Sequence, residues 1–262
     1  MRHRAAVLGS PIAHSLSPAL HRAAYGALGL DCTYDAIEMT PEGMPAFLAS
    51  LDDTWIGLSL TMPLKESVQP LLTEIDDVAL QTSSVNTVYR RDSGWAGSNT
   101  DVFGISTSLR EALTNEPRTA RLLGAGATAR SAVVAMCDLG VGSLVICARR
   151  ATQAQEIAEL AKSLGIEADV SDLEPVPVRE DLLISVLPGD AATPWAASSI
   201  SSEATLLDAS YHPWPSALAA AWPNGQVASG RDMLLWQATR QVTLMTGLPA
   251  PVDAMRAAIA GI

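Results

Sequence analysis

Lys65 stands out among the residues that could do chemistry, because the chain uses arginine almost everywhere else. Of the 17 basic residues, only Lys65 and Lys162 are lysine. An arginine cannot release its proton in a protein, whereas a lysine can when its surroundings lower its pKa. Lys65 follows the apolar run Trp55–Thr61 and is therefore a candidate for proton transfer, with a surface lysine at a strand's end as the plainer alternative. Lys162 lies three residues after Glu159 on a predicted polar helix face, where an ion pair explains it.

Two further polar groups could act beside this lysine. Ser15 and Ser17 surround a predicted helix start at Ser17-Pro18, where serine suits the N-cap and proline the first turn. Two hydroxyls beside the N–H groups of a helix start can hold a carboxylate, unless Ser17 serves only as the cap. Asp101, in the stretch GSNTDVFG (97–104), could favour the charged form of Lys65 or simply cap the next helix.

Residues 124–130 read GAGATAR, a G-x-G-x-x-A pattern between a predicted strand and a predicted helix. Gly124 allows a tight turn, Gly126 lets the backbone approach a pyrophosphate, and Ala129 allows the helix to pack closely on the strand. The start of the helix supplies N–H groups for the phosphates. Because both flanking elements are predicted in place, the pattern favours a dinucleotide site over an ordinary glycine-rich turn.

The end of the next strand indicates which dinucleotide binds. The stretch SLVICARR (143–150) ends in Arg149 and Arg150, where an NAD site would carry an aspartate or glutamate. Arginine can hold a 2′-phosphate through two hydrogen bonds. The sequence therefore predicts NADP(H), with two solvated surface arginines as the alternative.

The elements that must position these residues form two alternating series. In the first, strands at 5–9, 33–38 and 55–61 alternate with helices at 17–28, 44–51 and 67–72, which predicts a mostly parallel sheet covered by helices. Strands at 85–91 and 95–100 then flank the turn Asp92-Ser93-Gly94 and predict an antiparallel hairpin. If the hairpin is centred between Ser93 and Gly94, Asn86 lies opposite Asp101.

The second series follows a helix at 103–113. Strands at 120–123 and 143–148 alternate with helices at 130–139 and 152–164, and further strands are expected near 182–186, 205–208 and 226–229. Two helices, 233–247 and 252–259, end the chain. The fold class is therefore α/β with two domains, whose boundary is expected at 114–118 or inside a helix that acts as a hinge.

Composition excludes several classes of protein. A net charge of -11 and a pI near 4.7 argue against a nucleic-acid-binding surface. No apolar run is long enough for a signal peptide or a membrane span, so a cytoplasmic location is expected. The three cysteines show neither a pairing pattern nor metal-ligand spacing, and no metal is expected.

Six separated segments resemble the shikimate dehydrogenase family in order and spacing, over essentially the whole chain. They are GSPIAHSLSP (9–18), TMPLK (61–65), SVNT (84–87), NTD (99–101), GAGATAR (124–130) and GRDMLLWQA (230–238).

The resemblance implies the reversible reduction of 3-dehydroshikimate to shikimate with NADPH, in the pathway to chorismate and the aromatic amino acids. It implies a substrate-binding α/β domain at 1–102, completed by the C-terminal helices 233–262, and a Rossmann-type NADP-binding domain at 103–232. By the resemblance Lys65 is the catalytic acid–base, Asp101 is its partner, and Ser15 and Ser17 hold the substrate carboxylate. Residues that contact the ring hydroxyls or line the site would be Thr61, Asn86, Tyr211 and Gln237. Residues that bind the cofactor would be Gly124, Ala125, Gly126, Ala127, Thr128, Arg149, Arg150 and Gly230.

The chain also departs from the family pattern. Ser59 stands where many members have asparagine, and Ala148-Arg149-Arg150 stands where Asn-Arg-Thr is usual. Three alternatives stay open. One is a quinate/shikimate dehydrogenase with a broader substrate range, and another is a non-catalytic NADP sensor, which would need neither Lys65 nor Asp101. The third is a methylene-tetrahydrofolate-type dehydrogenase, which shares the lysine-bearing α/β architecture but not the serine pair. A monomer or a homodimer is expected.

Overall fold

The computed structural model describes residues 2–197, 203–223 and 225–260. The chain divides into two compact units, Met1–Thr100 with Leu234–Ile262 (unit 1) and Asp101–Met233 (unit 2). Both crossings between the units involve a helix, because α5 begins at Asp101 and α10 (Gly230–Thr246) contains Met233 and Leu234. The expected functional domains, 1–102 with 233–262 and 103–232, stay a prediction, because compactness does not show which ligand a unit binds.

Unit 1 is built on a six-stranded sheet in the order β2-β1-β3-β5-β6-β4. Strand β1 pairs in parallel with β2 and β3, β5 runs antiparallel to β3 and β6, and β4 is parallel to β6. The mostly parallel α/β fold predicted for this part is confirmed, with β5 making the sheet mixed. The strands are β1 (His3–Gly9), β2 (Cys32–Glu38), β3 (Trp55–Leu60), β4 (Glu74–Ile75), β5 (Thr87–Arg91) and β6 (Gly94–Ser98).

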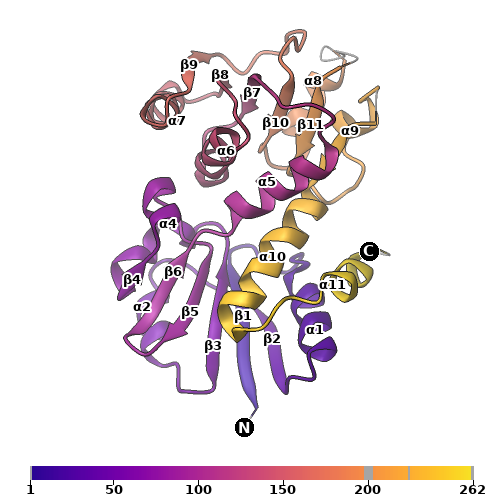
Figure 1. Ribbon diagram of the computed structural model, residues 1–262. Coiled ribbons are helices and arrows are strands. Elements are labelled where there is room, and N and C mark those ends of the chain that lie inside the picture. Colours follow the sequence, from indigo (N-terminus) through magenta and orange to yellow (C-terminus); the bar gives the residue numbers. More distant parts are fainter. Residues whose placement is uncertain (1, 198–202, 224, 261–262) are drawn as a thin grey trace. The chain divides into compact units, whose positions relative to one another are not determined.

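Successive side chains of β1 point to opposite faces of the sheet and pack into two separate apolar cores, one on each face. Ala5 and Val7 pack with α1, α10 and α11, and Figure 1 shows α11 beside α1. Ala6 and Leu8 pack with α2, α3 and α4 on the other face. The helices are α1 (Ser17–Ala27), α2 (Met44–Ala49), α3 (Leu64–Ser67), η1 (Gln69–Leu71), α4 (Asp77–Thr82), α10, and α11 (Val252–Ile259).

The helix that carries Lys65 begins earlier than predicted. It was expected to start at Ser67, but α3 starts at Leu64, so that Lys65 is its second residue. Leu64 and Val68 are fully buried and one helical turn apart, and packing both of them into the core requires the turn to begin at Leu64. Pro70 has no N–H group, and only a short 3-10 helix follows.

The hairpin has a different register from the predicted one. Thr87 lies opposite Ser98 and Arg91 opposite Gly94, so the connection is the two-residue loop at 92–93. Extended by one residue, this register places Asn86 opposite position 99, and the expected pairing of Asn86 with Asp101 is wrong. Gly94, with φ +128°, begins the second strand instead of completing the turn.

Unit 2 contains an all-parallel six-stranded sheet in the order β12-β11-β10-β7-β8-β9, which confirms the Rossmann-type prediction. The strands are β7 (Thr119–Leu123), β8 (Ser143–Cys147), β9 (Glu167–Ser171), β10 (Leu182–Ser185), β11 (Thr205–Asp208) and β12 (Val227–Ser229). The unpredicted β9 is polar and mostly exposed, so it lacks the apolar pattern of a buried strand. The helices are α5 (Asp101–Ala112), α6 (Ala127–Asp138), α7 (Ala151–Ser163), η2 (Gly189–Ala192), α8 (Thr193–Ala196), α9 (Ala217–Ala220) and the start of α10.

Among the described residues, no helix combines the length and the apolar character needed to cross a lipid bilayer.

Two glycines in unit 1 give opposite predictions for substitution by alanine. A Cβ on Gly57 of β3 would lie 2.9 Å from the Val88 carbonyl oxygen and 2.4 Å from Cγ of Met245 on α10, whereas nothing lies within 4 Å of a Cβ on Gly26 of α1. We expect Gly57→Ala to destabilise the chain by about 1–3 kcal/mol through overpacking. Gly26→Ala should stabilise it by up to about 1 kcal/mol. Urea-unfolding midpoints measure both, and an unchanged midpoint for Gly57→Ala would contradict the close packing of α10 on β3.

Candidate active site

Most of the polar residues singled out in unit 1 belong to one edge of its sheet. Because β1 and β3 are parallel and β5 runs against them, the carboxyl ends of β1 and β3 meet the amino end of β5 there. Ser15 and Ser17 follow β1, Thr61 and Lys65 follow β3, and Asn86 precedes β5. Crevices outside the carboxyl ends of strands are the usual ligand sites of open α/β sheets.

The two serines lie together, but Ser17 does not cap the helix. The N-cap residue is Leu16, which already has helical angles, and no side chain caps α1. The expectation of Ser17 at the N-cap is therefore wrong. Instead, the Ser17 N–H donates to the Ser15 hydroxyl oxygen at 3.3 Å. Ser17 is itself buried; burial raises the pKa of the Tyr34 phenol, and the Ser59 and Ser17 side chains act in the opposite direction.

The segment from Thr61 to Lys65 is fixed by its backbone. The Thr61 N–H donates to the Leu8 carbonyl at 2.9 Å, and the Lys65 carbonyl accepts from Val85 N–H at 2.7 Å. A Cβ on Gly9 would lie 2.3 Å from Cγ2 of Thr61, so only glycine allows this close approach at the end of β1. Leu64 is fully buried, which leaves its neighbour Lys65 half-buried at the sheet edge.

Asn86 and Gln237 are brought together from distant parts of the sequence. Asn86 Nδ2 donates to Gln237 Oε1 at 3.1 Å, and Gln237 Nε2 donates to the Leu234 carbonyl at 3.2 Å. Asn86 Oδ1 accepts from the Thr100 N–H at 2.8 Å. Both amides are buried and oriented, as donors and acceptors for ring hydroxyls should be.

Asp101 directly follows Thr100 and is the first residue of α5. It is buried, with 3% of its surface exposed, and belongs to unit 2. The residue before it, Thr100 of unit 1, donates its N–H to Asn86 Oδ1.

In unit 2, the glycine turn connects β7 to α6 as predicted, although α6 begins at Ala127, three residues before the expected Arg130. Gly124 has φ +112°, which favours glycine, and its Cβ would lie 2.9 Å from Cγ2 of Val186. A Cβ on Gly126 would meet nothing within 4 Å, so the space above this residue is open. No side chain caps α6, whose first residues include Thr128. An open turn with an uncapped helix start fits the phosphates of a dinucleotide.

The two arginines lie beside this turn. The strands β7 and β8 are parallel neighbours, and the Gly124 N–H donates to the Cys147 carbonyl at 2.9 Å. Arg149 and Arg150 follow β8 and are both exposed. An accessible guanidinium next to a phosphate-binding turn suits a 2′-phosphate.

Tyr211 and Gly230 are also brought together in unit 2. A Cβ on Gly230 would lie 2.2 Å from the Ala209 carbonyl oxygen, so the start of α10 can approach the end of β11 only with glycine here. The Arg231 guanidinium donates to the Tyr211 carbonyl at 3.5 Å. Burial raises the pKa of the Tyr211 phenol, which therefore stays protonated at neutral pH.

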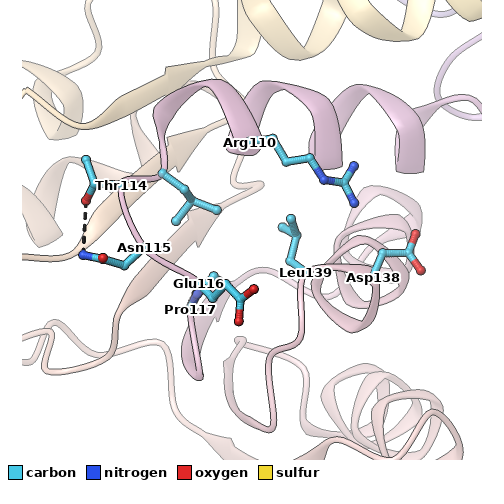
Figure 2. Close-up of a pocket in the computed structure, with 8 residues that line it drawn as sticks. Arg110, Thr114, Asn115, Glu116, Pro117, Asp138 and Leu139 are labelled. Carbon is cyan, nitrogen blue, oxygen red and sulfur yellow. Dashed lines mark hydrogen bonds between the residues drawn. The ribbon is translucent and has the colours of Figure 1, made fainter.

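A surface pocket of about 350 Å³ lies elsewhere in unit 2 (Figure 2). It is formed by the end of α5, the segment before β7 and the end of α6, which places it at the amino edge of the sheet, away from the glycine turn. None of the residues expected to bind substrate or cofactor lines it. Its lining residues are Arg110, Leu113, Thr114, Asn115, Glu116, Pro117, Asp138 and Leu139.

Sequence reasoning missed a buried polar group in unit 1. His21 stacks on Tyr34 with ring centroids 4.0 Å apart, and its Nε2 lies 3.1 Å from Gln241 Oε1. Burial lowers the pKa of His21 to about 4, although its hydrogen bond with Gln241 acts in the opposite direction. The signal was weak, since His21 lies on the apolar face of a helix, where its partners are not visible in the sequence.

Comparison with known proteins finds matching families, related sequences and similar solved structures. A model of the shikimate dehydrogenase substrate binding domain matches residues 7–88, and one of the shikimate 5'-dehydrogenase C-terminal domain matches residues 230–260. The shikimate dehydrogenase (NADP(+)) of Moorella thermoacetica is 35% identical over 95% of this chain and 90% of its own. A shikimate 5-dehydrogenase from Mycobacterium fortuitum is 40% identical in structure-based comparison, with a TM-score of 0.88 and 98% of each chain covered. The Thermus thermophilus enzyme, solved with NADP(H) and shikimate, is 29% identical, with a TM-score of 0.83 and 98% of each chain covered.

The buried His21 predicts a specific pH dependence of stability. Between about pH 6.5 and about pH 4 the unfolded chain binds a proton at this residue that the folded chain does not, so this contribution is complete above pH 6.5 and is lost as the pH falls through that window. The loss should reach about 3 kcal/mol in the free energy of unfolding. His21→Gln should show a smaller loss in urea titrations from about pH 7 to about pH 4.5. A matched control, His14→Gln at an exposed position, should keep the wild-type slope; equal slopes for all three chains would contradict the assignment.

Proposed function

The chain belongs to the shikimate dehydrogenase family, and we propose that it reduces 3-dehydroshikimate to shikimate with Lys65 as its acid–base residue. It is an NADP-dependent oxidoreductase of the shikimate pathway, as its full-length relatives are. The observation that carries the assignment of residues is the sheet edge in unit 1, where Lys65, the serine pair and Asn86 follow or precede neighbouring strands.

Lys65 would exchange the proton. When bound, NADPH supplies a hydride, and negative charge then develops on the oxygen of the substrate ketone. A lysine ammonium can donate a proton to that oxygen, take it back in the reverse direction, and stabilise the developing charge. The fixed backbone of Lys65 supports this role, because a proton donor must be held within hydrogen-bond reach of its target. We assign Asp101 as the partner carboxylate, on the strength of its burial and its place directly after Thr100.

The substrate's remaining groups match the other residues of the same edge. Ser15 and Ser17, at the start of α1, would bind the carboxylate with hydroxyl and N–H donors. Asn86 and Gln237 present oriented amides to ring hydroxyls, and Thr61 adds a hydroxyl next to Lys65. Tyr211, protonated at neutral pH, would line the site as a donor.

The cofactor would be held by the carboxyl edge of the sheet in unit 2. Residues 124–128 form the open turn and the first residues of α6 for the pyrophosphate, and Gly230 lies at the start of α10 after β12. Arg149 and Arg150 would hold the 2′-phosphate that distinguishes NADP from NAD. No carboxylate occupies positions 148–150, so nothing there repels that phosphate.

Lys65→Arg tests the proton transfer. The variant keeps a positive charge but cannot give up its proton, so we expect shikimate affinity to be largely kept while kcat falls about 100-fold or more. NADP+ reduction with shikimate, followed spectrophotometrically, measures kcat, with quinate and NAD+ assayed in parallel for substrate range. Lys162→Arg is the control, because this lysine is half exposed and pairs with Glu159 at 3.6 Å. Turnover near that of the wild type in Lys65→Arg would remove Lys65 from the role.

Arg149→Ala tests the cofactor assignment. A lost charge-assisted contact to the 2′-phosphate should raise KM for NADPH about tenfold to a hundredfold and leave KM for NADH nearly unchanged. Arg179→Ala, at an exposed position before β10, is the control. If the ratio of the two KM values stays at the wild-type value, Arg149 does not select the cofactor.

A further inference from the structure

Gln241 is a buried residue of α10 that none of the roles above includes. Only 1% of its surface is exposed, and its amide forms four hydrogen bonds, to Ser59, His21, Thr87 and the backbone of Asn86. A primary amide can accept two hydrogen bonds and donate two, so the capacity of this side chain is filled.

The orientation of the Gln241 amide follows from its partners. The Asn86 carbonyl oxygen can only accept, so it must face Gln241 Nε2, which lies 3.2 Å away. Gln241 Oε1 therefore faces the Ser59 hydroxyl at 2.8 Å and His21 Nε2 at 3.1 Å. The neutral imidazole of His21 then carries its proton on Nε2, and its Nδ1 accepts from the Tyr25 hydroxyl at 3.2 Å.

On one side, the hydrogen bonds of Gln241 reach β2 and α1, the helix that begins at Ser17. The Tyr34 hydroxyl donates to the Ser59 oxygen at 2.6 Å, which leaves the Ser59 proton for Gln241. Ser17 lies one helical turn before His21 on α1, and His21 Nε2 lies 3.1 Å from Gln241 Oε1. Ser17, at the proposed carboxylate end of the substrate site, is thus connected to Gln241 through the backbone of α1 and the His21 side chain.

On the other side, the hydrogen bonds of Gln241 continue to the paired amides of Asn86 and Gln237. Gln241 Nε2 donates to the Thr87 hydroxyl at 3.1 Å, and that hydroxyl donates to Asn86 Oδ1 at 2.8 Å. Asn86 Nδ2 then donates to Gln237 Oε1 at 3.1 Å. Gln241 therefore holds Asn86 twice, once at its backbone carbonyl and once, through Thr87, at its side-chain oxygen.

We propose that Gln241 is a positioning residue for the substrate: its amide fixes the spacing between Ser17 at the carboxylate end and Asn86 with Gln237 at the hydroxyl end. The proposal rests on the proposed function, because that function defines the two ends. A rigid substrate ring benefits from such a connection, since both sets of contacts can be made only if their separation matches the ligand. Buried networks with every member satisfied are rigid, and removing the central amide leaves several buried polar groups without partners at once.

The test is shikimate binding by calorimetry in the absence of cofactor. Gln241→Met keeps the size of the side chain and removes its hydrogen bonds, and we expect shikimate affinity to fall about tenfold. NADP+ affinity, which depends on unit 2, should not change and shows that the variant is folded. Thr239→Ala is the control on the same helix, because the Thr239 hydroxyl donates only to the Trp236 carbonyl, at 2.7 Å. Shikimate affinity at the wild-type value in Gln241→Met would overturn the proposal.

Two further variants separate positioning from general stability. Thr87→Val is nearly isosteric and removes only the hydroxyl between Gln241 and Asn86, so a severalfold loss of shikimate affinity is expected even if Gln241→Met fails to fold. Gln241→Ala removes the amide from α10. Adding Ser59→Asn places a new side-chain amide on β3 near the same point, because the Ser59 oxygen lies 2.8 Å from Gln241 Oε1. The double variant should bind shikimate more tightly than Gln241→Ala alone, a non-additive result that a purely structural loss does not give. Failure of both expectations also overturns the proposal.

The proposed function can fail separately. If the wild-type chain binds NADP+ but not shikimate, the substrate assignment is wrong. If it binds shikimate and the Gln241 and Thr87 variants bind equally well, the function stands and the positioning role is lost.

Discussion

Parallel pairing of strands is the constraint on which both candidate sites depend. It brings the carboxyl ends of strands that are far apart in sequence to one edge of a sheet. In unit 1 this places the residues after β1 beside those after β3, and the antiparallel β5 adds Asn86 because its amino end meets the same edge. In unit 2 the glycine turn after β7 lies beside Arg149 after β8 for the same reason.

Burial of polar groups then decides how firmly the residues of unit 1 are held. Removing an amide or hydroxyl group from water costs free energy unless the group finds a hydrogen-bond partner in the protein. Buried polar side chains therefore form connected networks. Here the network runs from Tyr34 on β2 through Ser59 on β3 to Gln241 on α10 and on to Asn86. Helix α10 therefore contributes more than apolar packing: its buried amides connect strands that would otherwise meet only through the sheet.

The net negative charge of the chain repels anionic ligands at long range, whereas local positive groups attract them at short range. The chain carries a net charge of -11, while NADP and a shikimate carboxylate are both anions. Screening at physiological salt limits the general repulsion to about 8–10 Å, so local positive groups dominate within a site. In the proposed sites, Arg149 and Arg150, Lys65 and the starts of α1 and α6 would supply them.

The sequence by itself determined the α/β class, the two alternating series and the glycine turn, because these follow from local patterns: strand and helix periodicity, and glycine spacing. The residues expected to bind substrate came mainly from the resemblance of separated segments to a known family. Tertiary structure decided the rest. The start of α3 at Leu64 depends on which side chains reach the core, and the hairpin register, which removes the expected pairing of Asn86 with Asp101, depends on how Gly94 continues the strand. The contact between His21 and Gln241 joins residues 220 positions apart, and no local pattern encodes such a pair, since a buried polar group is satisfied only by what folding brings next to it.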